Sequence, residues 1–403
     1  MVEKATEGDS PTAAVVLAAG EGTRLRPLTS NRPKPMLPVA TRSVLKYVLD
    51  SVIDAGIDEL HLIVGYRSSR VKSHIGSSYR DITIEYHQQE SQLGSGHALL
   101  QARDTIDAPF IVVNGDQIVD TEMVREVRAA YQAPATIAVV EADRAPQYGA
   151  VRLDGNQVSE IIERPQTGNY RLLNAGVYAF APAVFDRLEE LERVDGTLPL
   201  PAVIADYVDS DVPVTTVRSD WFWRDATYPW DLLALSQELQ TRGLVTLPEI
   251  RSNVFVSDSS QVHDQAILIS PVVVDDDAVV EAGAVVGPHA ALGANSNVEA
   301  GAVVRNSIID EGTRVGANAT VGQLVTGQDV QIGAGTTVAA GPADVQQGST
   351  VHENVELGAV LADRVHLGEG ATTLGGTQVG TDAVIGAGVV LDDAVDAKTR
   401  VIR

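Results

Sequence analysis

Two hydrophobic patterns divide the chain at about residue 245. In the first part, short apolar runs alternate with segments whose apolar residues recur at helical spacing. Ala13 to Ala19 is an apolar run without polar alternation and predicts a buried strand, whereas the apolar spacing over 43–55 predicts a helix. The alternation continues to about Val140 and predicts an α/β fold with a parallel sheet and helices on both faces. Further strands are expected over 60–64, 82–86 and 110–113, with helices near 67–77 and from Gly96.

In the second part, an apolar residue recurs every six positions from Val256 to Val304. The phase slips near Ile309 and Ile332 and resumes at Leu361. This is the hexapeptide repeat of a parallel β-helix, in which each short strand points one apolar side chain inward. We expect a flexible tail over 1–12, an α/β domain over 13–245 and a β-helix over 246–403. Such prisms commonly associate along a flat face, so a homo-oligomer is expected, as a trimer or a multiple of one.

The loop that follows the first strand has the composition of a phosphate-binding segment. Gly20 and Gly22 allow backbone N–H groups to approach a polyphosphate, and Thr23 and Arg24 add a hydroxyl and a cation. Prolines stiffen the continuation that presents Lys34. The spacing matches neither a P-loop, GxxxxGK[ST], nor the dinucleotide fingerprint GxGxxG.

From Gly20 the chain reads G-E-G-T-R-L-R-P-L-T, and from Arg32 it reads R-P-K-P-M-L-P-V. These stretches resemble the signature of the sugar-1-phosphate nucleotidylyltransferases. The resemblance implies a Rossmann-like nucleotidyltransferase domain followed by a left-handed parallel β-helix. It also implies condensation of a sugar 1-phosphate with a nucleoside triphosphate to give NDP-sugar and pyrophosphate. In that family the triphosphate lies over this loop, which implies nucleotide-binding roles for Leu17, Ala19, Gly20, Gly22 and Thr23, and catalytic roles for Arg24 and Lys34.

Two aspartates are the candidate metal ligands. Asp116 ends a buried apolar strand, where a carboxylate is costly unless a cation meets it. Mg²⁺ bridging triphosphate oxygens suits this position, because it takes one or two carboxylates and keeps several waters. The alternative, that Asp116 caps a helix, is weaker since Asp120 and Thr121 can serve. Asp225 lies in a stretch that resembles the family's second metal-ligand segment, with Ala226 where the family has glycine.

The segment Q-L-G-S-G-H-A that begins at Gln92 predicts a tight turn at a helix N-terminus. From the residues alone, a solvated loop and a binding loop are equally good interpretations. The segment is similar to one in the uridylyltransferases that make UDP-N-acetylglucosamine. That similarity implies that Gln89, Gly94 and Ser95 contact the nucleotide and that UTP or dTTP is preferred over GTP or ATP.

The sugar-binding residues are assigned by the same resemblance. Asn174 lies inside an apolar strand, where its amide needs a partner. The family pattern implies that glucose 1-phosphate or N-acetylglucosamine 1-phosphate is held by Gly149, Glu163, Arg164, Asn174 and Gly176. Arg164 stands where the family usually has lysine, so the phosphate contact keeps its charge but changes its geometry.

Composition narrows the partners and the cellular setting. The formal charge of −24, from 54 acidic and 30 basic residues, argues against nucleic acid or an anionic membrane as partner. An acidic, lysine-poor surface is typical of proteins that work at high salt, which screens their self-repulsion. Without cysteine there is no disulfide, thiolate nucleophile or Cys-ligated metal. The start of the chain has no signal-peptide core and no apolar run is long enough to span a membrane, so we expect a cytoplasmic protein.

Two other functions are weighed against this one. The whole-chain pattern also resembles bifunctional enzymes whose β-helix acetylates glucosamine 1-phosphate from acetyl-CoA, but Ala317 stands where the archaeal members have histidine. That histidine would be the general base for the amine. A non-catalytic subunit, as in the eukaryotic translation-initiation exchange factor, is the other alternative; the survival of Arg24, Lys34, Asp116 and Asp225 argues against it.

Overall fold

The structure is a computed structural model that describes residues 10–141, 149–163, 165 and 170–402. Residues 1–9 of the expected tail lie outside this range. Two compact units are formed, one by the chain up to Glu21 with Val44–Asp225, the other by Gly22–Ser43 with Ala226–Arg403. The sequence division at residue 245 follows the change of repeat pattern. The compact units differ from this division, because the loop 22–43 and helix α7 (Pro229–Thr241) belong to the same unit as the β-helix.

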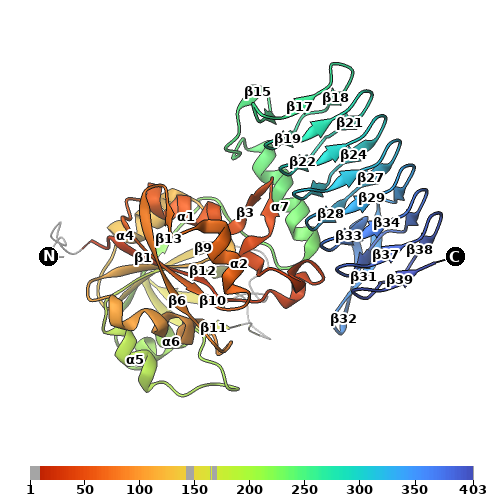
Figure 1. Ribbon diagram of the computed structural model, residues 1–403. Coiled ribbons are helices and arrows are strands. Elements are labelled where there is room, and N and C mark those ends of the chain that lie inside the picture. Colours follow the sequence, from red (N-terminus) through yellow and green to blue (C-terminus); the bar gives the residue numbers. More distant parts are fainter. Residues whose placement is uncertain (1–9, 142–148, 164, 166–169, 403) are drawn as a thin grey trace. The chain divides into compact units, whose positions relative to one another are not determined.

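The first unit is built around one large sheet (Figure 1). In spatial order its strands are β10 (Gly149–Asp154), β11 (Gln157–Glu163), β13 (Val214–Arg218), β9 (Ala135–Glu141), β12 (Leu172–Phe180), β7 (Phe110–Asn114), β1 (Ala13–Ala18), β4 (Glu59–Val64), β6 (Ile82–Gln88) and β5 (Ser78–Tyr79). A separate ladder pairs β8 (Gln117–Val119) with β14 (Trp223–Asp225). Every residue of β1 is buried, as its unbroken apolar run predicts.

Helices cover both faces of this sheet, as predicted. The alternate residues Ala13, Val15 and Leu17 of β1 pack into a core that also contains residues of the helices on one face. Those helices are α3 (Ser95–Leu99), the short 3₁₀ helix η4 (Leu100–Thr105), α5 (Val184–Glu190) and α6 (Pro201–Asp209). The opposite face carries α1 (Val44–Asp54) and α4 (Thr121–Ala129), which pack on each other (Figure 1). Helix α2 (Ser68–Ile75) connects β4 to β5.

The parallel sheet predicted from the first part of the chain is confirmed for its central strands, and antiparallel strands are added beside them. Strands β1, β4, β6 and β7 are parallel, but β12 runs antiparallel between β7 and β9, and β10 and β11 form an antiparallel hairpin. The physical reason is connectivity, because β12 follows a hairpin and not a crossover helix. A buried apolar run does not reveal its direction, so the pattern could not distinguish the two cases.

The second unit contains the β-helix, in which strands of successive coils pair in parallel in three sheets. The first sheet holds β15 (Glu249–Arg251), which is antiparallel, β16 (Val254–Val256), β19 (Val272–Val274), β22 (Ala290–Leu292), β25 (Ile308–Ile309), β28 (Leu324–Thr326), β33 (Ala359–Leu361) and β36 (Thr377–Val379). The second holds β17 (Gln261–Val262), β20 (Val279–Val280), β23 (Asn297–Val298), β26 (Arg314–Val315), β29 (Gln331–Ile332), β34 (His366–Leu367), β37 (Val384–Ile385) and β39 (Arg400–Val401). The third holds β18 (Ile267–Leu268), β21 (Val285–Val286), β24 (Val303–Arg305), β27 (Thr320–Gly322), β30 (Thr337–Val338), β35 (Thr372–Thr373) and β38 (Val390–Leu391).

A shorter coil explains the slip at Ile309, and an insertion explains the gap before Leu361. Val272 pairs with Ala290, 18 residues later, whereas Ala291 pairs with Ile308, 17 residues later. A coil that is one residue shorter shifts the phase at Ile309 while its side chain still points into the core. The longer gap before Leu361 contains an inserted hairpin of β31 (Pro342–Gln347) and β32 (Thr350–Glu356).

The segment 22–43 belongs to this second unit. It contains three single-turn 3₁₀ helices, η1 (Thr23–Leu25), η2 (Leu28–Ser30) and η3 (Lys34–Met36), and the small ladder of β2 (Pro38–Val39) and β3 (Arg42–Ser43). Its prolines exclude an α-helix, as the sequence predicted. None of the helices in the described ranges combines the length and the apolar composition that a membrane span needs.

Candidate active site

At the carboxyl edge of the sheet, the end of β1 makes close contacts with neighbouring segments of the chain. Gly115 donates its N–H to the Leu17 carbonyl at 2.9 Å, and a Cβ at Gly115 would lie 2.9 Å from that oxygen. The Ala19 carbonyl accepts from Gln92 Nε2 at 2.8 Å. Beyond it, Gly20 is exposed, and a Cβ there would meet no atom within 4 Å. The chain therefore leaves open space at the end of β1, where parallel sheets bind their ligands.

Of the two predicted metal ligands, Asp225 lies on β14 and Asp116 lies in the turn just before β8, the strand that pairs with β14. In the β8–β14 ladder Asp225 is opposite Gln117, and Asp116 immediately precedes Gln117. Paired residues in an antiparallel ladder have Cα atoms about 4.5–5.5 Å apart, so the backbone of Asp225 lies beside the residue that follows Asp116. Asp120, and not Asp116, caps α4, because its Oδ1 accepts from the Glu122 N–H at 2.8 Å. Asp116 is therefore not the cap of α4.

The predicted base-reading residues form a connected group at the N-terminus of α3. Gln89 is buried, and its Nε2 donates to the Gly94 carbonyl at 3.1 Å and to His97 Nδ1 at 3.0 Å. Gly94 has φ +99°, and a Cβ there would lie 2.4 Å from the Leu198 carbonyl oxygen, so only glycine fits. Ser95 Oγ accepts from the Leu200 N–H at 2.8 Å and so fixes the start of α6.

His97 was missed by the sequence reasoning, although it lies in the quoted segment. Burial, with a smaller contribution from Arg193, lowers the pKa of His97, so its imidazole is neutral at pH 7. A neutral ring can accept the Gln89 amide hydrogen at Nδ1, whereas a protonated ring cannot. His97 therefore orients the Gln89 side chain.

Three of the predicted sugar-binding residues meet at one point. Gly149 pairs with Glu163 across the β10–β11 hairpin. A Cβ at Gly149 would lie 3.6 Å from both Asn174 Cβ and Glu163 Oε1. Asn174 Nδ2 donates to the buried Tyr178 hydroxyl at 2.7 Å, which supplies the partner that its amide needs. Arg164 lies outside the described residues.

Gly176 leaves room for two amides close to the aspartates. It has φ +71°, and a Cβ there would lie 2.3 Å from Asn114 Nδ2 and 2.5 Å from Gln117 Oε1. Gln117 is buried, and its Oε1 has no hydrogen-bond partner among the described residues. Such an orphaned acceptor suits a donor supplied by a ligand. Gln117 was missed because glutamine after a strand gives no distinctive sequence signal.

In the second unit, the loop brings its two predicted cationic residues to defined positions. Gly22 has φ +74°, and a Cβ there would lie 2.6 Å from Lys34 Cβ, so glycine allows Lys34 to pack against the turn. Thr29 Oγ1 donates to the Gly22 carbonyl at 2.9 Å and closes the turn. Lys34 is only 8% exposed. The Arg24 guanidinium lies 5.8 Å from the centroid of the Tyr228 ring.

The β-helix supports this loop through contacts that the sequence did not predict. Arg32 is buried and forms an ion pair with Asp310, and its Nη2 lies 3.7 Å from Asp363 Oδ1. Burial alone would lower the pKa of Arg32, but the two carboxylates raise it, so the guanidinium stays charged. Asn31 Nδ2 donates to Asp363 Oδ2 at 3.2 Å. No local pattern links residues more than 270 positions apart, so this support could not be read from the sequence.

The inserted hairpin adds a second support. His352 on β32 packs against Tyr228 and Trp230, with ring centroids 4.5 and 5.2 Å apart. Gln347 Nε2 donates to the Arg26 carbonyl at 3.1 Å. Asp231 accepts from the Thr227 and Tyr228 N–H groups at 2.9 and 2.8 Å and so caps the start of α7. The hairpin therefore contacts both Tyr228, on which Arg24 rests, and the loop itself.

The position expected for an acetyl-transfer base has no side chain able to take a proton. Ala317 lies in the turn before β27, and its N–H donates to Glu299 Oε2 at 2.9 Å. Exposed histidines occur elsewhere in the β-helix, for example His366 on β34.

Comparisons with known proteins agree with this geometry. The family model "Nucleotidyl transferase" matches residues 13–242, "GMPPB C-terminal domain" matches 268–374, and "Hexapeptide repeat of succinyl-transferase" matches 362–393. The "Bifunctional protein GlmU" of Methanocaldococcus jannaschii is 29% identical over 405 residues, covering 97% of each chain. The "UTP--glucose-1-phosphate uridylyltransferase AglF" of Haloferax volcanii is 34% identical over 235 residues, covering 56% of this chain and 96% of its own.

One more curated relative and one solved structure extend the comparison. The "Low-salt glycan biosynthesis nucleotidyltransferase Agl11" of Haloferax volcanii is 30% identical over 335 residues, covering 79% of this chain and 93% of its own. A solved structure from Bacillus anthracis, described as a glucose-1-phosphate thymidylyltransferase in complex with a sucrose, shares the fold with a TM-score of 0.51. It is 22% identical and covers 56% of this chain and 93% of its own. The chain therefore belongs to the nucleotidyl transferase family, as an enzyme whose α/β domain is followed by a left-handed hexapeptide-repeat β-helix.

Proposed function

We propose that this enzyme condenses a sugar 1-phosphate, glucose 1-phosphate or N-acetylglucosamine 1-phosphate, with UTP or dTTP to give the NDP-sugar and pyrophosphate. The observation that carries the proposal is the pairing of Asp225 with Gln117, the neighbour of Asp116, at the edge of the sheet where β1 ends in a glycine-rich turn. The names of AglF and GlmU support the sugar-nucleotide assignment.

The residues at this edge fit Mg²⁺. Asp116 and Asp225 are both half-buried and offer hard carboxylate oxygens, the ligands that Mg²⁺ takes from proteins that bind nucleoside triphosphates. When bound, Mg²⁺ would neutralise charge on the phosphate oxygens. Asp116 and Asp225 are therefore proposed as its two protein ligands.

The reaction needs positioning and charge compensation, and no covalent intermediate. A phosphate oxygen of the sugar 1-phosphate forms the new bond to the α-phosphorus, and the α–β bridging bond breaks with its electron pair leaving on pyrophosphate. Arg24 and Lys34 are proposed to stabilise the charge that develops on the departing phosphates. Leu17, Ala19, Gly20, Gly22 and Thr23 are proposed to line the nucleotide with backbone groups and a hydroxyl.

The base preference is assigned to Gln89. Its amide nitrogen is held by Gly94 and His97, so Oε1 is the atom that can accept from the N3–H of uracil or thymine. Cytosine has an acceptor at N3 and therefore cannot make this contact with Oε1. Ser95 is proposed to keep the Gly94 turn in place.

The sugar is proposed to lie against Gly149, Glu163, Asn174 and Gly176, with Arg164 on its phosphate. Glu163 supplies a carboxylate for hydroxyl groups, and the absence of a side chain at Gly149 leaves room beside it. The buried Gln117 Oε1 is an additional acceptor for a sugar hydroxyl.

Acetyl transfer in the β-helix is the second candidate, because the full-length relative is named bifunctional. Ala317 removes the general base that the family route uses. We therefore propose nucleotidyl transfer as the activity of this chain and treat acetyl transfer as the outcome to be tested beside it.

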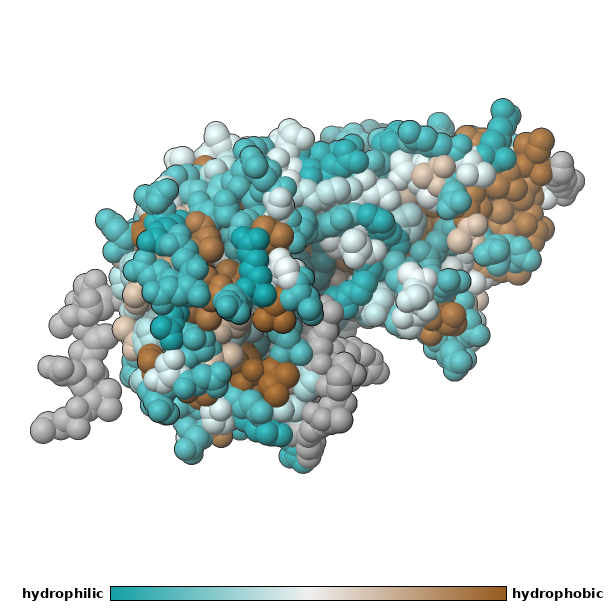
Figure 2. All heavy atoms as spheres, turned by 90° about the horizontal axis from the view of Figure 1, so that it is seen from below, coloured by the Kyte–Doolittle hydropathy of each residue, from teal (hydrophilic) through white to brown (hydrophobic). Residues whose placement is uncertain are grey.

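We also propose that the protein is a homo-oligomer, a trimer or a multiple of one, assembled through the β-helix. Figure 2 shows hydrophobic surface gathered near the C-terminal end of the β-helix. Leu374, Val390 and Ile402 are exposed apolar side chains in its last coils. Light scattering of the purified protein should give a mass that is a multiple of three chains, whereas a monomer would contradict the assignment.

The experiment that tests the function is a substrate matrix at high KCl. Each of glucose 1-phosphate, N-acetylglucosamine 1-phosphate and glucosamine 1-phosphate is combined with UTP, dTTP, GTP or ATP, and pyrophosphate release is followed. We expect release with UTP or dTTP and at least one of the first two sugars, only when Mg²⁺ is present. Release with no combination would overturn the proposal. Acetyl-CoA added with glucosamine 1-phosphate tests the β-helix, where we expect no free CoA to form.

A further inference from the structure

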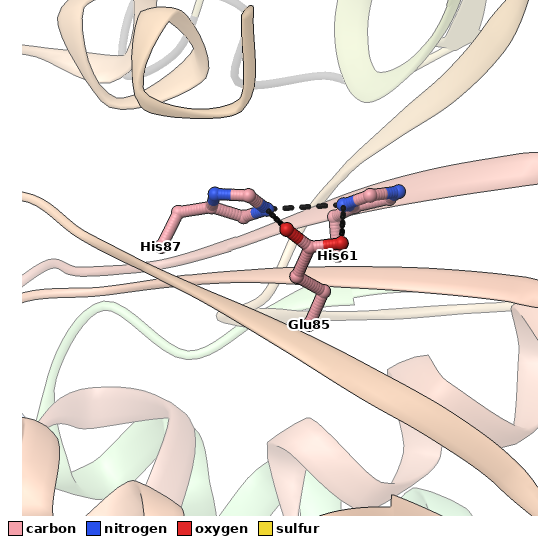
Figure 3. A group of neighbouring side chains, drawn as sticks. All are labelled: His61, Glu85 and His87. Carbon is pink, nitrogen blue, oxygen red and sulfur yellow. Dashed lines mark hydrogen bonds and ion pairs between the residues drawn. The ribbon is translucent and has the colours of Figure 1, made fainter. Parts of the chain in front are cut away.

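Four side chains with metal-ligand chemistry lie together on one face of the sheet, away from the residues discussed so far. Glu59 and His61 are two residues apart on β4, and Glu85 and His87 are two residues apart on β6. His61 pairs with Glu85 in the parallel register, so all four side chains point to the same face. The reactive atoms of His61, Glu85 and His87 lie within 4.8 Å of one another (Figure 3).

The two imidazoles approach each other edge to edge. His61 Nδ1 lies 3.0 Å from His87 Nε2, while the ring centroids are 5.2 Å apart with an interplanar angle of 26°. The two ring centroids are farther apart than the two facing nitrogens by roughly two ring radii. Each ring therefore turns one nitrogen toward the other ring (Figure 3). The side chain of His61 is 1% exposed and that of His87 is 9% exposed, so water does not separate them easily.

The positions of the protons on the His61 and His87 rings favour a cation between them. His61 Nε2 lies 2.9 Å from Glu59 Oε1, so this nitrogen carries the proton and donates to the carboxylate. His87 also hydrogen-bonds to the backbone of Gln101, and this bond favours a higher pKa of His87, so the Gln101 carbonyl is the acceptor. Because His87 Nε2 faces His61, the nitrogen that donates to this carbonyl is Nδ1. With one proton on each ring, His61 Nδ1 and His87 Nε2 turn their lone pairs toward the same point. Two facing lone pairs repel unless a cation lies between them.

We propose that His61 Nδ1, His87 Nε2 and the Glu85 carboxylate form a binding site for a divalent transition metal of the Zn²⁺ type. Ligand atoms at about 2.0–2.1 Å around a tetrahedral ion lie about 3.3 Å apart. The observed separations are 3.0 Å between the nitrogens and 3.8 and 3.9 Å from them to Glu85. The Glu85 side chain is 53% exposed, so its carboxylate can adjust and a water can take the fourth position.

The surroundings match those of protein-bound zinc. Metal-ligating histidines usually donate their other N–H to a carboxylate or a backbone carbonyl, which fixes the tautomer. Glu59 does this for His61 and the Gln101 carbonyl for His87. Two imidazoles and one carboxylate with an open position also form a ligand set that Zn²⁺ favours and Mg²⁺ does not.

This site is distinct from the paired aspartates. His61 is at the register level of Val15, which pairs with Val112, four residues before Asp116. The ion would join β4 to β6 and, through Gln101, to η4. Because the ion would bind the folded protein and not the unfolded chain, it would stabilise the outer part of the sheet.

The test uses untagged, chelator-stripped protein titrated with Co²⁺, whose visible absorption reports nitrogen ligation. An Asp116→Asn background removes binding at the aspartates. We expect about one equivalent of Co²⁺ with visible bands, displaced by Zn²⁺, and a melting temperature that rises with Zn²⁺. His87→Gln and Glu85→Gln should each lose the bands and the shift, whereas His366→Gln, on an exposed coil, should keep both.

Two results would overturn the site. The first is the absence of stoichiometric Co²⁺ binding, which would mean that the imidazoles share a proton only. The second is binding that His87→Gln and Glu85→Gln leave intact, which would place the metal elsewhere. Glu85→Gln changes an exposed side chain, so a folding defect in His87→Gln cannot blur the outcome; circular dichroism verifies both variants.

Discussion

The two regions that carry the proposed chemistry are held in place by different means. Asp116 and Asp225 are positioned by strands that pair with each other inside the first unit. The loop with Arg24 and Lys34 is positioned by side chains of the β-helix, above all by the buried contacts of Arg32 with Asp310 and Asp363. The difference teaches that the β-helix is more than an assembly module, because it supports the loop that is proposed to bind phosphates.

The largest effect is expected at the strand-held region. Asp116→Asn keeps the shape of the side chain but removes the charge that would hold the cation. We expect kcat for pyrophosphate release to fall roughly 10³-fold, comparable to the loss of a strong transition-state contact. The melting temperature should stay close to that of the wild type. Near-normal turnover would contradict the metal assignment.

The next effect should come from breaking the support of the loop. Arg32→Met leaves Asp310 and Asp363 buried without their partner, which costs about 3–5 kcal/mol in comparable buried pairs. We expect this to displace the loop and to lower kcat/KM about 10²-fold, as a misplacement of about 1 Å can do. Thermal unfolding and steady-state kinetics measure the two effects.

A matched control is the exposed pair of Arg364 and Asp382 on neighbouring coils, 2.7 Å apart. Arg364→Met should change stability by about 1 kcal/mol or less and leave the kinetics unchanged. If Arg32→Met behaves like Arg364→Met, the β-helix does not support the loop and the comparison fails.

A smaller effect is expected at the inserted hairpin. His352→Ala removes ring contacts with Tyr228 and Trp230 worth about 0.5–1.5 kcal/mol in total. Arg24 rests on Tyr228, so we expect kcat/KM to fall a few-fold while KM for the sugar phosphate changes little. His366→Ala, on an exposed coil, serves as the control.

The smallest effect concerns pH and the contact between His97 on α3 and Gln89 in the first unit. The lowered pKa of His97 means that the folded protein binds this proton less readily than the unfolded chain. Its stabilising contribution is therefore complete above pH 6.5 and is lost as pH falls through the folded pKa. Protonation also breaks the Gln89 contact, so we expect KM for UTP to rise about threefold below that pKa, the loss of one modest hydrogen bond.

The control is His97→Asn, whose side-chain oxygen can accept from Gln89 but does not titrate. Between pH 5.5 and 8 its KM for UTP should follow only the ionisation of the nucleotide. An identical pH profile in the wild type would remove His97 from the base-reading group.

Much of this molecule follows from local pattern. The apolar run of β1, the hexapeptide repeat, and the glycine turns at Gly22 and Gly94 each lie where the sequence predicted them, because each depends on neighbouring residues. The antiparallel insertion of β12 did not follow, since a buried apolar strand carries no sign of direction.

The remainder depends on contacts between distant residues. Arg32 meets Asp310, and His61 meets His87, through folding alone, so no spacing in the sequence indicates either contact. Gln117 is recognised only by the burial of an acceptor without a partner. The predicted roles of Arg24, Lys34, Asp116 and Asp225 remain predictions about chemistry that need kinetic tests.

The most direct test of the central claim is a double-mutant cycle on the two aspartates. Pyrophosphate release is measured for Asp116→Asn, Asp225→Asn and the double variant at saturating Mg²⁺. If both carboxylates hold one ion, each single variant loses most of the rate and the double variant is hardly slower than either. Independent, multiplying losses in the double variant would contradict a shared ion and with it the proposed active site.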